Sequence, residues 1–212
     1  MLQNVIVLLA CFLLSQEVPL IDLTTAPVYP RVKEPTQGRV IGGAAGGKPS
    51  WPLQVKLVSA RQEMSEEASF IVYEIELRNT GKNAIDFPVD PSLRDIEPAG
   101  PSVKSYEYVS ALITIQAQPA RGRLKLKPLG LYGAESSPGT QRRLMPGDAI
   151  RIRAKARFTQ ESDGAVPNGL SPPFAISAFL TLYREVVTGD SVETRQFMGP
   201  IESSNLVPIA DP

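Results

Sequence analysis

The fold class follows from one segment, Ile71-Val72-Tyr73-Glu74-Ile75-Glu76-Leu77-Arg78. Its odd-numbered residues are apolar, and its even-numbered residues, apart from Val72, are charged. Successive side chains of a β-strand point to opposite faces, so this alternation predicts a strand with one face in a core and the other in water. The residues from Leu53 to Val58 alternate in the same way and predict a second strand.

Further strands are predicted on the C-terminal side of this segment. The turn residues Asn79-Thr80-Gly81-Lys82 are followed by alternation from Ile85 to Val89, which together predict a hairpin. Met145-Pro146-Gly147-Asp148 places Pro and Gly at the two central positions of a type II turn, so a strand should follow directly. Thr188-Gly189-Asp190-Ser191 predicts the turn before the last strand. The remaining strands are predicted at 106–117, 124–126, 150–158, 174–187 and 192–198.

Seven to eight strands without a convincing helix predict an all-β protein, an immunoglobulin-like antiparallel β-sandwich. A small barrel is the alternative. The 20 prolines and 16 glycines of the 212 residues are spread between apolar runs, as expected where turns join many short strands. We expect the sandwich domain to span residues 52–199, followed by a C-terminal tail at 200–212.

The N-terminal residues predict an exported protein. The apolar run from Val5 to Leu14 has the length of a signal-peptide core and is too short to span a bilayer, although no Lys or Arg precedes it. We therefore expect a signal peptide at 1–20 and a Pro/Gly-rich linker at 21–51. The mature chain would be periplasmic or extracellular and would have no membrane span. The alternative is a lipoprotein anchored through Cys11, but the apolar residues Phe12 to Leu14 that follow argue against it.

Composition excludes several classes of site. The chain has no histidine, which excludes His-based catalytic triads and His-ligated zinc. Cys11 is its one cysteine, so without the leader it has neither disulfides nor thiolate chemistry. Lys plus Arg and Asp plus Glu both number 22, which gives no reason to expect nucleic acid as a partner. We expect no cofactor and no metal.

Two segments resemble trypsin-like serine proteases. Arg39-Val40-Ile41-Gly42-Gly43 resembles the activation site of that family, and Gly189-Asp190-Ser191 resembles the core of its nucleophile segment. The family's mechanism needs a histidine to take the serine proton, and this chain has none. The likeness is therefore coincidental, and the two segments are interpreted as linker and hairpin turn.

A second resemblance covers about half of the domain. The strand ending in Arg78-Asn79-Thr80-Gly81-Lys82, its continuation at Ile85, and the later Leu144-Met145-Pro146-Gly147-Asp148 resemble bacterial immunoglobulin-like domains of the BsuPI proteinase-inhibitor type. This resemblance implies a fold more than an activity, and no inhibitory residues are identifiable.

The sharpest local charge feature is a basic face along one predicted strand. It could bind a polyanion, but Glu74 and Glu76 on another strand could instead neutralise it through cross-strand pairs, which we favour. Acidic loop residues could ligate calcium, but we favour ordinary turn residues. Aromatic residues could stack on a sugar, but we favour packing within the strands. The basic face comprises Arg151, Arg153, Lys155 and Arg157; the loop residues are Asp90, Asp95, Glu97, Glu161, Asp163 and Asn168; the aromatic residues are Trp51, Tyr106, Tyr108 and Tyr132.

No catalytic residue can be assigned from these patterns. We expect a non-enzymatic module of the cell envelope that binds a protein or a glycan. The alternatives are a proteinase inhibitor of the BsuPI-like kind and a carboxylate-based hydrolase, for which the spacing of acids along the chain is no test.

Overall fold

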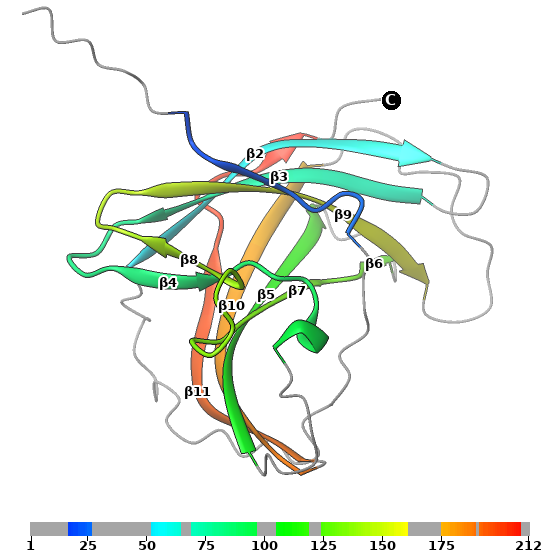
Figure 1. Ribbon diagram of the computed structural model, residues 1–212. Helices are drawn as coiled ribbons and strands as arrows, with labels where there is room; N and C mark the ends of the chain where they lie inside the picture. Colours follow the sequence, from blue (N-terminus) through cyan, green and yellow to red (C-terminus); the bar gives the residue numbers. More distant parts are fainter. Residues whose placement is uncertain are drawn as a thin grey trace, which may run out of the picture.

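The computed structural model describes residues 17–26, 52–64, 69–96, 105–118, 124–160, 175–189 and 191–208. They form twelve β-strands and one short 3-10 helix, so the fold is all-β (Figure 1). Within these ranges, no helix has the length and apolar character needed to cross a bilayer. The apolar run Val5–Leu14, Cys11, the protease-like segment at Arg39 and Trp51 lie outside the described residues.

Two sheets form the layers of a sandwich. The first has the order β1 (Leu20–Asp22), β9 (Ala149–Gln160), β3 (Ser69–Asn79) and β2 (Leu53–Met64), with β6 (Leu124–Leu126) also paired to β9. The second has the order β11 (Ser191–Glu202), β10 (Ala175–Thr188), β5 (Ser105–Gln118) and β7 (Leu129–Gly133), with β12 (Val207–Pro208) beside β10. In Figure 1, β5, β10 and β11 run steeply beneath the layer of β2, β3 and β9.

A two-stranded sheet lies at one end of the sandwich. It pairs β4 (Ile85–Pro88) with β8 (Gln141–Leu144) in antiparallel register. Among the described strands, β1 pairs with β9 in parallel, whereas every other pair is antiparallel. The strand β1 therefore joins the sheet as a separate segment, remote in sequence from its neighbour.

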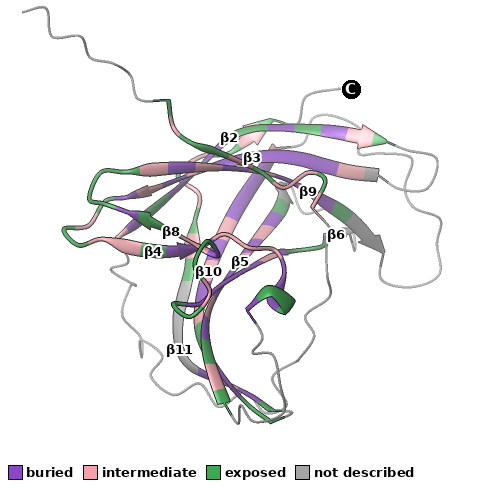
Figure 2. Cartoon of the chain, viewed as in Figure 1, coloured by how far each residue is buried: buried purple, intermediate pink, exposed green. Residues whose placement is uncertain are grey.

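The main core lies between the two sheets. Ile71, Tyr73, Ile75 and Leu77 of β3 are fully buried there, as the alternation predicts, in one cluster with apolar side chains of β9, β5 and β10. Figure 2 shows buried residues along β3 and along the facing part of β10. Each such aliphatic side chain contributes roughly 1.5–3 kcal/mol through burial. The central members include Ile71, Ile75, Leu77, Ile113, Ile152 and Leu180.

A smaller cluster covers the opposite face of the second sheet. The helix η1 (Leu93–Asp95) places Leu93 against Tyr108, Tyr132 and Val187. Tyr132 packs edge-to-face on Tyr108, with ring centroids 5.9 Å apart. The second sheet is thus covered on one face by the first sheet and on part of the other face by the segment that carries η1.

All eight strands predicted from the sequence are present. The four additional strands are short: β1, β7, β8 and β12 have three, five, four and two residues. Such short segments give too few alternations for a period of two to be recognised. Gly147 has a φ of 88°, as the central position of a type II turn requires, and the Asp148 amide donates to the Met145 carbonyl at 2.9 Å. The hairpin at Thr188 is also confirmed, because β10 and β11 pair through Thr188 and Ser191.

The hairpin predicted between residues 71–78 and 85–89 is wrong. The strand β3 pairs with β2 and β9, whereas β4 pairs with β8 in a different sheet. The reason is that the residues after β3 bond elsewhere: the Asn79 amide donates to Asp148, and the Thr80 amide donates to Pro52. The first bond holds the turn against the β8–β9 turn and the second extends the pairing with the start of β2, so the turn does not lead β4 back onto β3.

The sandwich extends beyond both predicted boundaries. Leu20–Asp22 form β1, although this segment was expected at the border of signal peptide and linker. The strand β11 continues through Pro200 to Glu202, where a register shift against β10 accommodates the proline, and β12 lies within the expected tail. Proline is tolerated in edge strands and at bulges, so Pro200 does not end the strand.

Candidate functional site

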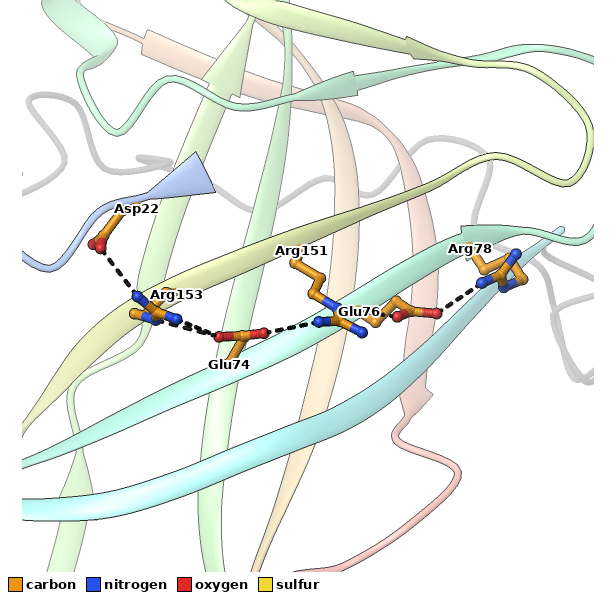
Figure 3. Close-up of polar contacts among 6 residues, drawn as sticks. All are labelled: Asp22, Glu74, Glu76, Arg78, Arg151 and Arg153. Carbon is orange, nitrogen blue, oxygen red and sulfur yellow. Dashed lines mark hydrogen bonds and ion pairs between the residues drawn. The ribbon is translucent and has the colours of Figure 1, made fainter. Parts of the chain in front are cut away.

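The basic face predicted on β9 is neutralised by its neighbouring strand. In the register of the sheet, Arg153 lies opposite Glu74 and Arg151 lies opposite Glu76. Figure 3 shows these side chains as a continuous series of ion pairs that begins at Asp22 of β1 and ends at Arg78 of β3. The predicted cross-strand pairing of Glu74 and Glu76 with this face is thereby confirmed.

The distances show a connected network. Arg153 Nη2 lies 3.0 Å from Glu74 Oε2, and its Nη1 lies 3.6 Å from Asp22 Oδ2. Arg151 contacts both acids of β3, at 3.6 Å to Glu74 Oε1 and 3.2 Å to Glu76 Oε2. Glu76 Oε1 in turn accepts from Arg78 Nη2 at 2.9 Å. Three acids and three bases alternate along this path, so its formal charge is zero.

The pKa of Glu76 reflects this arrangement. Burial beside β2 and β9 tends to raise it, but the hydrogen bonds from Arg78 and then Arg151 outweigh burial and hold the pKa below its ordinary value. Glu63 on β2 behaves similarly, because hydrogen bonds from Lys155 and Arg61, both at 2.7 Å, lower its pKa. Both carboxylates are therefore ionised structural partners.

The fourth basic residue of this face differs from the others. Arg157 is exposed and lies opposite Phe70, and within the described ranges it has no ion pair. Three of the four predicted polyanion contacts are therefore already paired with acids. A polyanion would have to displace those acids, so the geometry disfavours this face as a binding surface.

A second candidate lies at the end of the first sheet, where β8 separates from β9. A groove of about 650 Å³ is formed there by residues 17–21, Arg142–Leu144 of β8, the turn residues Gly147 and Asp148, and the start of β9. Arg78 also lines the groove from the end of β3. Segments from four parts of the chain thus surround one hollow with both apolar and charged walls.

The three arginines of this groove differ in how far they are already engaged. Arg78 donates to Glu76 and, through Nη1, to the Gly147 carbonyl at 3.0 Å. Arg143 lies 3.9 Å from Asp86, and both side chains are largely exposed. Arg142 is exposed and makes no hydrogen bond or ion pair within the part of the chain that the structure describes. Arg142 and Arg143 are therefore available for an anionic group.

Beside the groove, the fully buried Asn79 joins the turn after β3 to the end of β8. Its Nδ2 donates to the carbonyls of Asn83 and Leu144 at 2.8 and 2.9 Å, and its Oδ1 accepts from the Gly81 amide at 2.9 Å. Its backbone carbonyl accepts from the Gly147 amide at 2.9 Å. The two turn motifs that carry the BsuPI-type resemblance therefore meet at one corner of the fold, where their role is structural.

The remaining predicted candidates show packing or turn roles. Tyr106, Tyr108 and Tyr132 do come together, but Tyr108 and Tyr132 are buried in the smaller core cluster and offer no flat exposed surface. Asp90 accepts from the Ser92 amide at 2.7 Å, as a turn residue does. Its pKa is raised, first by burial and then by the nearby Asp95 carboxylate.

No metal site is assembled in the described ranges, where no three His, Cys, Asp or Glu side chains are grouped as ligands. Glu97, Glu161, Asp163 and Asn168, which were considered as calcium ligands, lie outside the described residues.

Comparisons with known proteins assign no family. No family model matches the chain, and no curated protein matches it. A solved structure described as the X-ray structure of Northeast Structural Genomics Consortium target SoR45 aligns with 72% of this chain and 85% of its own length. The identity is 14% and the TM-score is 0.28, so this alignment establishes neither a shared family nor a function.

The groove residues were missed by sequence reasoning. Arg142 and Arg143 are adjacent on β8, a strand too short to be recognised, and the opposite wall at 17–21 was assigned to the signal peptide and the first residue of the linker. No local pattern links these segments, because they meet only through the pairing of β1 with β9 and the turn at Gly147.

Proposed function

We propose that this chain is an exported, non-enzymatic β-sandwich module of the cell envelope that binds an anionic ligand, part of a protein or a glycan, in the arginine-lined groove. The observation that carries the proposal is that Arg142 and Arg143 of β8 both border a hollow of about 650 Å³. Arginine is the residue best suited to carboxylate, sulfate or phosphate groups, because its planar guanidinium offers paired donors.

The surroundings support a ligand that also has apolar parts. Val18, Leu20 and Ile21 line one wall, and Leu144 and Ile150 line another. Binding sites commonly combine apolar walls with a few polar groups that fix orientation. Glu17 and Asp148 lie in the same groove, but Asp148 Oδ2 already accepts from the Met145 amide at 2.8 Å. The lining therefore holds three arginines and two carboxylates, a formal charge of +1, which favours an anionic ligand.

The test is a titration of the purified protein with polyglutamate and, separately, with heparin. We expect binding of at least one, and the double variant Arg142→Gln/Arg143→Gln should weaken it by about tenfold or more. Arg157→Gln is the matched control, because Arg157 is an equally exposed arginine of the same domain outside the groove. It should change the dissociation constant by less than about twofold.

Two results would overturn the proposal. If Arg157→Gln weakens binding as much as the groove variant does, the binding site lies on the outer face of the first sheet. An absence of binding to both probes at low ionic strength, where electrostatic attraction is screened least, would remove the anionic ligand altogether. Turnover in a hydrolase screen that one Asp or Glu substitution abolishes would contradict the non-enzymatic role.

A further inference from the structure

The strand β1 presents an unusual edge to the groove. It is an outer strand of the first sheet, held by three residues in parallel register, with Ile21 opposite Ile152. The Arg151 amide donates to the Pro19 carbonyl, and the Leu23 amide donates to the Arg153 carbonyl, both at 2.8 Å. In a parallel ladder, alternate residues bond to the same neighbour. Pro19, Ile21 and Leu23 therefore face β9, whereas the backbone groups of Val18, Leu20 and Asp22 point away from it.

Two of these three outward-facing residues border the groove, together with Pro19 and Ile21, whereas Asp22 does not. Val18 and Leu20 both line it, and Leu20 is 44% exposed although its neighbours Ile21 and Leu23 pack against the main core. An exposed strand edge with unpaired donors and acceptors is a template for another extended segment. The groove thus combines the free backbone edge of β1 with Arg142 and Arg143 of β8 among its lining residues.

We propose that the groove takes an extended acidic peptide of a partner protein, which adds as a strand to the outer edge of β1 and places its carboxylates toward Arg142 and Arg143. This inference rests on the proposed function and specifies its ligand. Charge complementarity selects the acidic side chains, while the edge of β1 selects a polypeptide backbone, which a glycan lacks. Strand addition also explains a groove with both apolar and charged walls, because alternate side chains of an extended peptide face opposite sides.

The experiment uses a short synthetic peptide in which glutamate alternates with threonine. We expect it to slow hydrogen exchange of the Leu20 and Asp22 amides, which point away from β9, while the Ile21 amide is already protected by β9. A second peptide, N-methylated at alternate residues on the edge that would face β1, keeps the charges but cannot form the ladder. It should bind at least about tenfold more weakly.

A matched pair of variants tests the same geometry from the protein side. Leu20→Pro removes an amide that points away from β9, so β1 should stay docked while peptide affinity falls by about tenfold. Ile21→Pro removes an amide that bonds β9 and should release β1 itself. The exchange rates of the Arg151 and Arg153 amides report whether β1 remains docked in each variant.

The outcomes separate this inference from the proposed function. If the peptide and its N-methylated form bind equally, and Leu20→Pro has no effect, strand addition is refuted, even where Arg142→Gln still weakens binding. If heparin binds in an Arg142-dependent manner and the peptide does not, the ligand is a glycan and the peptide inference fails alone. If the double variant Arg142→Gln/Arg143→Gln changes no binding at all, both proposals fail.

Discussion

Replacing Asn79 should lower the stability of the fold by more than the small volume of its side chain suggests. Its side chain is fully buried and makes three hydrogen bonds, to Asn83, Leu144 and Gly81. A net contribution of about 1 kcal/mol each gives about 3 kcal/mol, and the Leu144 carbonyl would be left without its donor in a buried position. We therefore expect Asn79→Ala to lower the free energy of unfolding by about 3–4 kcal/mol.

Asn79→Asp distinguishes lost hydrogen bonds from lost volume. The carboxylate would face two carbonyl oxygens to which the amide now donates, so it should cost at least as much as alanine at neutral pH. In the folded state its pKa would be raised above the unfolded value. The loss relative to the parent protein should therefore shrink as the pH falls through that raised pKa and the group becomes neutral.

The assay is urea unfolding followed by circular dichroism, with the slope of the transition compared between variants. Asn83→Ala is the control, because Asn83 contributes its backbone carbonyl and its side chain is exposed. It should cost less than about 0.5 kcal/mol. If Asn79→Ala stays within about 0.5 kcal/mol of the parent with an unchanged slope, the role of this corner in holding the fold is refuted.

Three further predictions concern the edge of β2, the β8–β9 turn and the charge network. Asn205→Ala should cost about 1–2 kcal/mol in urea unfolding and promote self-association in sedimentation, because Asn205 bonds both the amide and the carbonyl of Leu57, each at 2.9 Å. Gly147→Ala should lower thermal stability by about 1–2 kcal/mol, because its φ of 88° strains any side chain; unchanged stability would contradict that conformation. The folded pKa of Glu76 lies below its ordinary value of 4.5, so its stabilisation is present above that pH and is lost as the pH falls through the folded pKa. Unfolding of Glu76→Gln between neutral and acidic pH should therefore show a shallower decline than the parent.

The strands were predictable because each long one carries its own burial pattern. In β3 the apolar odd-numbered residues are buried, and in β9 Ile150, Ile152 and Ala154 alternate with arginines in the same way. Strand order was not predictable in this manner. Whether the segment after Asn79 folds back on β3 depends on bonds to Asp148 and Pro52, which are remote in sequence. Local turn chemistry at Thr80 and Gly81 therefore predicted a turn correctly and its partner strand incorrectly.

The edge contacts illustrate the same limit at single residues. Asn205 bonds the backbone of Leu57 at a register shift in β2, and the Ser204 amide donates to Val55 at 2.9 Å. An asparagine near the end of a chain is an ordinary turn residue by composition. Asn205 covers the edge of β2 by bonding Leu57, which lies 148 residues away in the sequence. The residues around Asn205 alone therefore give no sign of this contact.

Charge on one strand is a poor guide to a binding site for a related physical reason. The cationic residues of β9 form the most conspicuous pattern in the sequence, yet the register places Glu74 and Glu76 opposite two of them. A sheet exposes the sum of its neighbouring strands, so a basic stripe beside an acidic stripe presents little net field to a ligand. Arg142 and Arg143 form a much shorter pattern but border a hollow whose lining, with Arg78 and the acids Glu17 and Asp148, keeps a formal charge of +1. The capacity to attract an anion thus depends on which segments the fold brings around a hollow, and here β8 of the two-stranded sheet and the edge strand β1 of the first sheet border the same one.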